Sequence, residues 1–362
     1  MKTQHRIIIG DARDMNQVGD NQVDLVVTSP PYPMIKMWDK LFSELNEDIR
    51  DALQMEDGDK AFDLMHQELN KVWMEVERVL KSGGLACINI GDATRKLGET
   101  FQLYSNHVKI IDFFRNIGFI VLPDILWRKP SNSPNKFMGS GMLPTNAYVT
   151  LEHEYILIFR KGEKKRIFKP KSETRYNSAY FWEERNRWFS DVWYDIKGTL
   201  QNLNNNKLRN RAAAFPLELP YRLINMYSIY GDTVLDPFWG TGTTSLAAMI
   251  CGRNSIGYEI EKEFSSLFDE RINNAPNISE EINRKRIEAH KKFIKERLAN
   301  NKKLKHKALN YHFPVTTKQE KHIKLYLIQK SIKEGNRYTV EYEKFDDIEK
   351  AIQINFEGFS VK

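Results

Sequence analysis

The most unusual candidate for chemistry is a rigid corner that carries an aromatic ring. The apolar run VDLVVTS (23–29) ends at Ser29 and is followed directly by Pro30, Pro31 and Tyr32. Each proline fixes its own φ angle and lacks a backbone donor, so the chain is stiff where the expected strand ends. Prolines at strand-to-loop junctions also occur in ordinary turns, so this motif needs support from elsewhere in the chain.

A second stretch, TVLDPFWGTGTT (233–244), has the residue types of a ligand-binding turn. The expected strand ends at Asp236, and Gly240 and Gly242 stand where a backbone can pass close to a ligand. Small hydroxyl residues, of which Thr243 is one, open the helix that follows. A glycine turn by itself is weak evidence, because similar turns serve many purposes.

An acidic residue on the next expected strand strengthens the interpretation of this turn. The strand SIGYEIE (255–261) brings Glu259 to its carboxyl end, where a carboxylate can accept hydrogen bonds from two ribose hydroxyls. The turn lacks the third glycine of the dinucleotide fingerprint and opens with Asp-Pro-Phe. These residues therefore favour a nucleoside ligand without a pyrophosphate.

The amino-acid composition is typical of a globular protein. The chain has 362 residues, of which 41% are hydrophobic and 28% charged, as expected for one large α/β domain with insertions or for two domains. No apolar run approaches the ~18 to 20 residues of a membrane span, and the first residues do not resemble a signal peptide. Cys87 and Cys251 lie in apolar segments and are expected to be buried free thiols, so we expect a cytoplasmic protein with no membrane partner.

The charge balance is basic, with a net charge of +7 and a pI near 9.0. Much of the excess lies in the last ninety residues, above all in the helical stretch NRKRIEAHKKFIKERLANNKKLKHK (283–307). Such a stretch is either a solvated helix face or a surface for a polyanion, and charge alone does not decide between them.

Strands alternate with helices along most of the chain, which indicates a doubly wound sheet. The expected strands are 5–11, 23–29, 85–92, 120–130 and 152–162, with two more in the turn region, TVLD and SIGYEIE. The expected helices include 66–84, ended by Gly83 and Gly84, as well as 106–119 and 215–228. Between 161 and 212 the periodicity breaks, and basic residues alternate with aromatics. That composition suits either an irregular surface insertion or a nucleic-acid contact.

Taken together, DPFWGTGTT (236–244) and TSPPYP (28–33) resemble the motifs of amino-group DNA methyltransferases that use S-adenosylmethionine. The catalytic motif precedes the cofactor motif, which is the order of the permuted β group of that family. The resemblance covers about 5–275 and includes the helix FPLELPYRLI before the cofactor strand. It implies an α/β fold: a Rossmann-like, mostly parallel, seven-stranded sheet, circularly permuted, with a target-recognition insertion and a small basic C-terminal extension.

The same resemblance implies a division of the chain into four parts. Residues 1–160 would form the catalytic half, 161–212 the target-recognition region, 213–275 the cofactor-binding half and 276–362 the basic extension. The 161–212 region occupies the place where β-group enzymes carry their recognition residues, which favours DNA contact there. No counterpart of the extension is recognised.

The chemistry implied by the resemblance explains the rigid corner. An exocyclic amine is a poor nucleophile because its lone pair is delocalised into the base, so the base must be flipped out and held flat. The Ser29 hydroxyl and the Pro30 carbonyl can accept hydrogen bonds from the amine, and Pro31 helps to keep the corner rigid. Tyr32 supplies a stacking face worth ~1 to 3 kcal/mol. This chemistry needs no metal, and the absence of a Pro-Cys corner argues against attack on a pyrimidine ring.

Other roles follow from the family pattern. Asp11 should approach the cofactor adenine, and Phe238 and the loop glycines should line the methionine and ribose side. Trp127 matches the family's aromatic that faces the target base, although a core tryptophan is an equally good interpretation. The 215–228 helix should close the methionine pocket, and AAAFP replaces the Lys-Pro or His-rich version of many relatives, which leaves the partner of the cofactor carboxylate open.

We therefore expect site-specific methylation of double-stranded DNA, with S-adenosylmethionine as cofactor. Ser29 favours cytosine N4 over adenine N6, because the family's adenine enzymes mostly carry Asp or Asn at this position. A restriction-modification system with a cognate endonuclease is the expected setting. An RNA base methyltransferase and an inactive DNA-recognition subunit are the alternatives.

Overall fold

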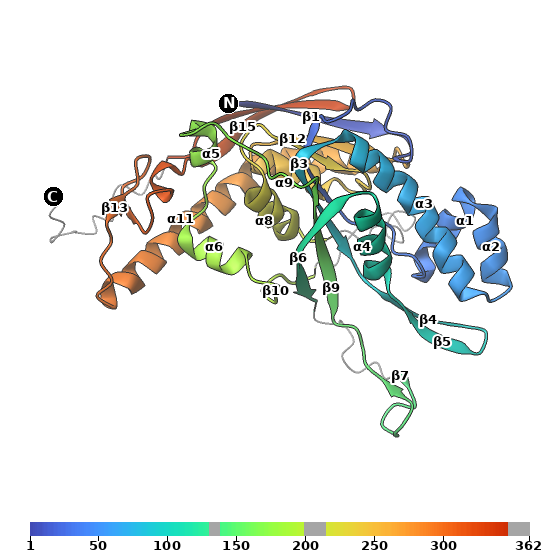
Figure 1. Cartoon of the computed structure of the whole chain (residues 1–362). Coiled ribbons are helices and arrows are strands. Elements are labelled where there is room, and N and C mark those ends of the chain that lie inside the picture. Colours follow the sequence, from blue (N-terminus) through green and yellow to red (C-terminus); the bar gives the residue numbers. More distant parts are fainter. Residues whose placement is uncertain (130–137, 199–214, 347–362) are drawn as a thin grey trace.

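A ten-stranded sheet forms the centre of the computed structural model, which describes residues 1–129, 138–198 and 215–346 (Figure 1). The strand order is β10-β6-β9-β3-β2-β11-β12-β1-β16-β15. The strands are β1 (Lys2–Ile9), β2 (Val23–Thr28), β3 (Leu80–Ile90), β6 (Phe119–Arg128), β9 (His153–Lys161), β10 (Val192–Trp193), β11 (Thr233–Asp236), β12 (Asn254–Glu259), β15 (Tyr326–Glu334) and β16 (Arg337–Lys344).

The seven strands expected from the sequence occupy seven adjacent positions, from β6 to β1. Within this group β3, β2, β11, β12 and β1 pair in parallel, whereas β9 runs antiparallel to both of its neighbours. Strand β11 comes late in the chain but lies between β2 and β12. The expected Rossmann-like sheet and its permuted chain order are confirmed.

Three strands extend the sheet beyond the expected seven. β10 pairs with β6 at one edge, and the β15–β16 hairpin adds antiparallel strands beside β1 at the other. Tyr338, Val340 and Tyr342 of β16 are buried in the same core cluster as β2 and β11 residues. The C-terminal extension is therefore partly built into the sheet.

Helices cover both faces of the sheet, as its continuous apolar strands predict. Leu25 and Val27 of β2 belong to one hydrophobic cluster, and Val26 belongs to another on the opposite face. The helices are α1 (Asp39–Leu45), α2 (Glu47–Gln54), α3 (Gly58–Val79), α4 (Asn106–Asn116), α5 (Glu173–Asn177), α6 (Trp182–Trp188), α8 (Glu218–Tyr227), α9 (Thr243–Ile250), α10 (Phe264–Asn273) and α11 (Ala275–Ala299), with short 3-10 turns at Lys36–Trp38 and Glu320–His322. Helices α8, α9 and α10 pack on the first cluster and α3 and α4 on the second.

Three two-stranded hairpins stand apart from the main sheet. They are β4–β5 (Ala93–Leu97 and Thr100–Tyr104), β7–β8 (Met138–Gly139 and Ala147–Tyr148) and β13–β14 (His306–Lys307 and Pro314–Val315). Figure 1 shows the first two projecting below the sheet on the side where β6 ends. No helix in the described ranges has the length and apolar character that a membrane crossing requires.

The sequence predicts a helix over 66–84, and the predicted C-terminal end is wrong. Helix α3 ends at Val79, and Gly83 and Gly84 lie inside β3. The register between β2 and β3 shifts at this point, because Val23 pairs with Leu80 but Leu25 pairs with Leu85. Gly83 has a φ of 77°, and a Cβ on Gly84 would stand 2.8 Å from a backbone oxygen. The two glycines therefore accommodate an irregularity in the sheet, and helix termination does not depend on them.

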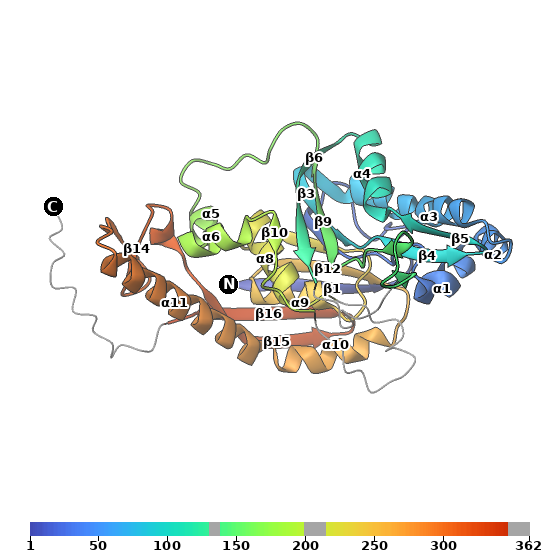
Figure 2. The same cartoon turned by 90° about the horizontal axis from the view of Figure 1, so that it is seen from below.

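The segment after β9 is joined to the C-terminal helix. Glu184 of α6 forms an ion pair with Arg286 of α11, and Glu183 lies 2.9 Å from Nδ1 of His290. A third hydrophobic cluster forms around Phe181 and includes residues of α11 and of the chain after it. Figure 2 shows α6 beside α11, away from the β4–β5 hairpin. Part of the 161–212 region and the C-terminal extension are thus one packed unit.

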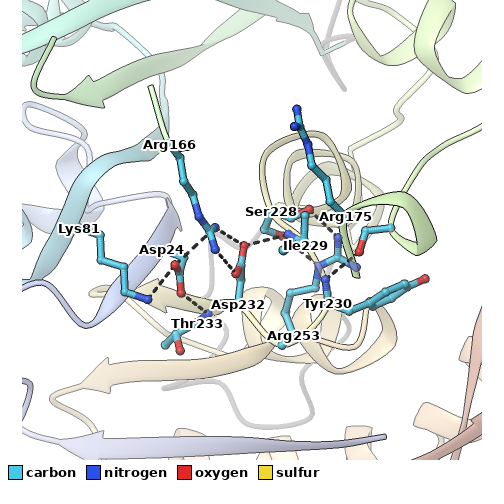
Figure 3. Close-up of polar contacts among 12 residues, drawn as sticks. Asp24, Lys81, Arg166, Arg175, Ser228, Ile229, Tyr230, Asp232, Thr233 and Arg253 are labelled. Carbon is cyan, nitrogen blue, oxygen red and sulfur yellow. Dashed lines mark hydrogen bonds and ion pairs between the residues drawn. The ribbon is translucent and has the colours of Figure 1, made fainter. Parts of the chain in front are cut away.

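An ionic cluster fixes this segment to the sheet (Figure 3). The Arg166 guanidinium pairs with both oxygens of Asp232, at 2.5 and 2.7 Å, and also approaches Asp24, which binds Lys81 at 2.8 Å. Asp24 lies near the start of β2 and Asp232 precedes β11, so the cluster lies at the amino ends of these strands. The candidate site lies at the opposite, carboxyl ends of these strands.

Candidate active site

A cavity of about 490 Å³ opens at the carboxyl ends of the central parallel strands. Ligands in open α/β sheets bind at this edge, where loops from adjacent strands converge. The cavity is lined by all but one of the residues singled out in the sequence: Asp11, Ser29, Pro30, Pro31, Tyr32, Trp127, Asp236, Phe238, Gly240, Thr243 and Glu259. Gly242 is the exception. The two motifs, about two hundred residues apart in the chain, therefore face one cavity.

Asp236 connects the two motifs directly. Thr28, the last residue of β2, donates a hydrogen bond from Oγ1 to Asp236 Oδ1 at 2.6 Å, and the Phe238 amide donates to the same oxygen at 3.1 Å. Burial raises the pKa of Asp236 to about 6, although these hydrogen bonds act in the opposite direction. Ser29 follows Thr28, so this carboxylate holds the start of the Pro-Pro-Tyr corner against the glycine turn.

The two glycines of the turn have different surroundings. Gly240 has a φ of 51°, and a Cβ built there would meet nothing closer than the Phe238 carbonyl at 3.9 Å. Gly242 has a φ of 75°, and its Cβ would stand 2.4 Å from the Phe268 ring and 2.7 Å from Trp239. The space beside Gly240 belongs to the cavity, whereas the space beside Gly242 is filled by the core.

Glu259 ends β12 opposite the turn, as the sequence predicts. Its Oε2 accepts a hydrogen bond from the Gly240 amide at 2.7 Å, and its Oε1 accepts one from the Glu261 amide at 2.9 Å. Burial raises the pKa of Glu259, and the backbone donors partly offset that effect. Each carboxylate oxygen has a second lone pair, so the carboxylate can still accept from a ligand hydroxyl.

Asp11 lies just beyond β1, which ends at Ile9 and so is shorter at this end than expected. Arg13 holds the Asp11 carboxylate with a backbone amide at 2.9 Å and with Nε at 2.8 Å, and also pairs with Glu68 at 2.6 Å. The pKa of Asp11 is lowered by these contacts despite the opposing effect of burial. Arg13 and Glu68 also line the cavity, and neither residue stands in a motif that would have predicted this.

The Tyr32 hydroxyl is the centre of a hydrogen-bond network at the Pro-Pro-Tyr corner. It accepts from Ser29 Oγ at 3.1 Å and from Asn89 Nδ2 at 2.8 Å, and it donates to Glu154 Oε2 at 2.9 Å. Burial and the neighbouring Glu154 carboxylate raise the pKa of Tyr32 well above its ordinary value, so the hydroxyl stays protonated. The network fixes the ring in one orientation.

Glu154 is the main residue of the corner that sequence reasoning missed. It lies in β9 and binds Asn89 Nδ2 at 2.7 Å and Lys129 Nζ at 2.8 Å, in addition to Tyr32. The signal was present in the sequence, because Glu154 stands at the start of an otherwise apolar strand, EYILIF. A largely buried carboxylate on such a strand requires partners.

Trp127 is a core tryptophan that also lines the cavity, and its contact with a target base stays a prediction. It is buried in the core with 1% exposure, and its Nε1 donates to the Ile196 carbonyl at 2.9 Å. It also lines the cavity, and Lys129 Nζ lies 5.2 Å from its ring centroid.

Cys87 and Cys251 are both free and buried, as expected.

Comparison with known proteins identifies the family. A family model described as DNA methylase, N6_N4_Mtase, matches residues 23–270. The chain belongs to this DNA methylase family. The methylase is 60% identical over 329 residues to the type II methyltransferase M.MthZI of Methanothermobacter thermautotrophicus, covering 90% of this chain and 91% of that one. It is 57% identical over 281 residues to M.MjaI of Methanocaldococcus jannaschii, covering 75% and 91%.

A solved structure extends the comparison to the cofactor. A Thermus thermophilus protein described as a DNA modification methylase, complexed with S-adenosyl-L-methionine, superposes on the methylase with a TM-score of 0.59 and 33% identity. It covers 75% of this chain and 94% of the other. The methylase is thus a type II amino-group DNA methyltransferase that uses S-adenosylmethionine as methyl donor.

The residues around the cavity fit this cofactor. Gly240 presents backbone and open space, Glu259 presents a carboxylate, and apolar side chains such as Leu69 and Val72 complete the wall. This is the combination of open backbone, acid and apolar surface that a nucleoside ligand requires.

Proposed function

We propose that this methylase transfers a methyl group to the N4 amine of cytosine in double-stranded DNA. The observation that carries the proposal is the cavity lined by both the Ser-Pro-Pro-Tyr corner and the glycine turn, with Asp236 bonded to Thr28 between them. A methyl donor held at the turn and a base held at the corner would then be adjacent.

Within this proposal the turn side of the cavity holds the cofactor. Glu259 accepts hydrogen bonds from the ribose hydroxyls, Asp11 lies toward the adenine, and Phe238, Gly240 and Thr243 line the remaining wall. When bound, S-adenosylmethionine supplies an electrophilic methyl group. Burial of Glu259 makes its hydrogen bonds to a ligand stronger than they would be in water, because the local dielectric is lower.

The corner side holds the flipped base. The Ser29 hydroxyl and the Pro30 carbonyl accept hydrogen bonds from the amine, and Pro30 and Pro31 keep both acceptors in place. Tyr32 stacks on the base, with its hydroxyl fixed by Asn89 and Glu154. Ser29 Oγ, which donates to Tyr32 here, retains lone pairs for the amine hydrogens.

Ser29 is the basis for choosing cytosine. Its hydroxyl stands one atom closer to the backbone than the acceptor oxygen of an aspartate or asparagine at the same position would. Adenine N6 is the second candidate. The whole pocket must match the size of the base, and Ser29 alone does not determine whether a pyrimidine or a purine fits.

The two similar proteins carry names of type II methyltransferases, which supports a restriction-modification role with a cognate endonuclease as partner. The 161–212 region is proposed to recognise the DNA sequence, and its residues 199–212 lie outside the described ranges. An intact Ser29–Tyr32 corner and glycine turn argue against an inactive recognition subunit.

Transfer of labelled methyl from S-adenosylmethionine to unmethylated bacteriophage DNA tests this proposal. We expect the wild-type chain to label DNA and Ser29→Ala to lose most of the label while cofactor affinity, measured by calorimetry, stays near that of wild type. A parallel reaction with RNA as the substrate tests the alternative that the chain is an RNA base methyltransferase. Label that enters RNA but not DNA would overturn the proposal.

A further inference from the structure

One short segment, residues 291–307, is strongly basic. This segment contains seven lysines, one arginine and one glutamate, which gives a formal charge of +7. The whole chain carries 55 basic and 48 acidic side chains, which is also +7. The rest of the protein is neutral as a whole, but its 161–212 region is also basic, with 13 basic and six acidic side chains. These two basic segments are the parts of the chain from which a long-range attraction for a polyanion can originate.

The charges of this segment differ from those of the preceding part of α11. In the first half of the helix, Arg284 pairs with Glu280, Lys285 with Glu281 and Arg286 with Glu184. Farther along, exposed lysines have no carboxylate partner within the described ranges: Lys292, Lys295, Lys302, Lys303, Lys305 and Lys307. A solvated helix face is expected to mix both signs along its length, as the first half does.

The lysines are presented by a folded support. Ile294 and Leu304 are buried, with 1% and 6% exposure, so the helix end and the chain after it both have side chains anchored in the protein. Ile287 and Ala308, on either side of the segment, belong to the cluster around Phe181. Phe181 directly precedes α6, so the positive charges have a fixed place relative to the segment proposed to recognise DNA.

The position of α11 relative to the cavity indicates how a long polyanion could contact both. Figure 1 shows α6 and β10 between α11 and β6, and in Figures 1 and 2 the end of α11 projects beyond α6, away from β6. The end of β6 carries Trp127, and Lys129 follows it, and both residues line the cavity. A long, rigid polyanion that binds at this cavity would have to pass β10 and α6 to reach the lysines, which therefore lie outside the target site.

We propose that residues 291–307 bind phosphates of the DNA duplex outside the target site. The inference rests on the proposed function only in taking duplex DNA as substrate. Unpaired, exposed lysines suit phosphate oxygens as point charges, and each contact releases counterions from the DNA. The segment would then contribute affinity and orientation but no sequence preference.

The test compares two double variants on the same helix and the chain that follows it. Lys302→Gln with Lys303→Gln removes two unpaired charges, whereas Arg284→Gln with Lys285→Gln removes two charges that are paired with glutamates. Fluorescence anisotropy measures the affinity of each full-length chain for a random-sequence DNA duplex over a series of NaCl concentrations, after melting curves confirm that each variant is folded.

We expect the first variant to bind more weakly and to show a shallower dependence of log affinity on log salt. The slope should fall by ~0.9 for each lysine that contacts a phosphate, hence by up to ~1.8. The control should keep the wild-type slope. Equal slopes and affinities for the two variants would overturn the inference. A wild-type chain that binds duplex DNA but transfers no methyl group would contradict the proposed function and leave this inference standing.

Discussion

At the scale of single residues, Tyr32 combines two features that mutation can separate, an aromatic face and a hydroxyl. The face is assigned to the target base, and the hydroxyl belongs to the network with Ser29, Asn89 and Glu154. The network explains why a tyrosine serves here, because a ring without a hydroxyl would leave buried polar groups with fewer partners.

We predict that Tyr32→Ala abolishes most methyl transfer and that Tyr32→Phe retains more, since the π-face persists. The phenylalanine variant should lose about 1 kcal/mol of stability for the missing hydrogen bonds. Glu154→Gln, which keeps an acceptor for the hydroxyl, should resemble Tyr32→Phe. Initial rates at saturating cofactor and thermal unfolding measure these effects. Equal losses of activity for Phe and Ala would show that the hydroxyl, and not the face, carries the function.

A second residue-scale prediction concerns pH and Asp236. Its pKa is raised from the ordinary 3.8 to about 6, so the folded state holds this proton more tightly than the unfolded chain does. The associated stability is fully present below about pH 4 and is lost as pH rises through about 6. Two pKa units correspond to roughly 3 kcal/mol.

Asp236→Asn should remove this contribution while keeping an acceptor for Thr28. Denaturant unfolding between about pH 4 and 7 should therefore show a smaller decrease of the free energy of unfolding with pH in the variant than in wild type. Superimposable pH profiles would mean that Asp236 already titrates near its ordinary value.

At the scale of elements, the turn between β11 and α9 separates ligand approach from packing. Gly242→Ala would force a Cβ against Phe268 and Trp239 at a positive φ, which should cost about 2 kcal/mol or more. Gly240→Ala has the same positive-φ strain, about 1 to 2 kcal/mol, but no clash, so it should destabilise the fold less than Gly242→Ala and weaken cofactor binding, because its Cβ would enter the cavity. Melting curves and calorimetry with S-adenosylmethionine distinguish the two. A Gly242→Ala chain that melts at the wild-type temperature would refute the packing role.

The elements also show which parts of the fold can be predicted from the sequence. Seven strands were identified because continuous apolar runs and terminal acids mark buried parallel strands. The β15–β16 hairpin was missed although its Gly335-Asn336 turn and alternating polar and apolar residues are a hairpin signal. The hairpin lies beyond the part of the chain that resembles the family, so no family pattern marks it as part of the sheet. The partners of Tyr32 and Asp11 could not be predicted, because Glu154 and Arg13 gain their roles only through strand pairing and packing.

At the scale of the whole molecule, the C-terminal extension is tied to the catalytic sheet. Thr3 and Tyr342 share a hydrogen bond of 2.9 Å, and Thr3 binds His5, whose pKa is lowered to about 3 by burial. A chain that ends at residue 275 would expose β1 as an edge strand and uncover these buried groups.

We therefore predict that the 1–275 chain aggregates or melts far below the full-length protein, even though it retains every residue assigned to the cavity. Soluble yield, sedimentation and thermal unfolding measure this directly. A monomeric 1–275 chain with the full-length melting temperature would show that the extension is a separable addition.

The measurement that tests the central claim most directly is nucleoside mass spectrometry of DNA methylated by the purified protein. Digestion of the product to nucleosides separates N4-methylcytosine from N6-methyladenine, and Ser29→Ala provides the matched control with a near-intact cofactor site. The account predicts N4-methylcytosine from the wild-type chain and little of it from the variant. N6-methyladenine as the sole product would contradict the assignment that rests on Ser29.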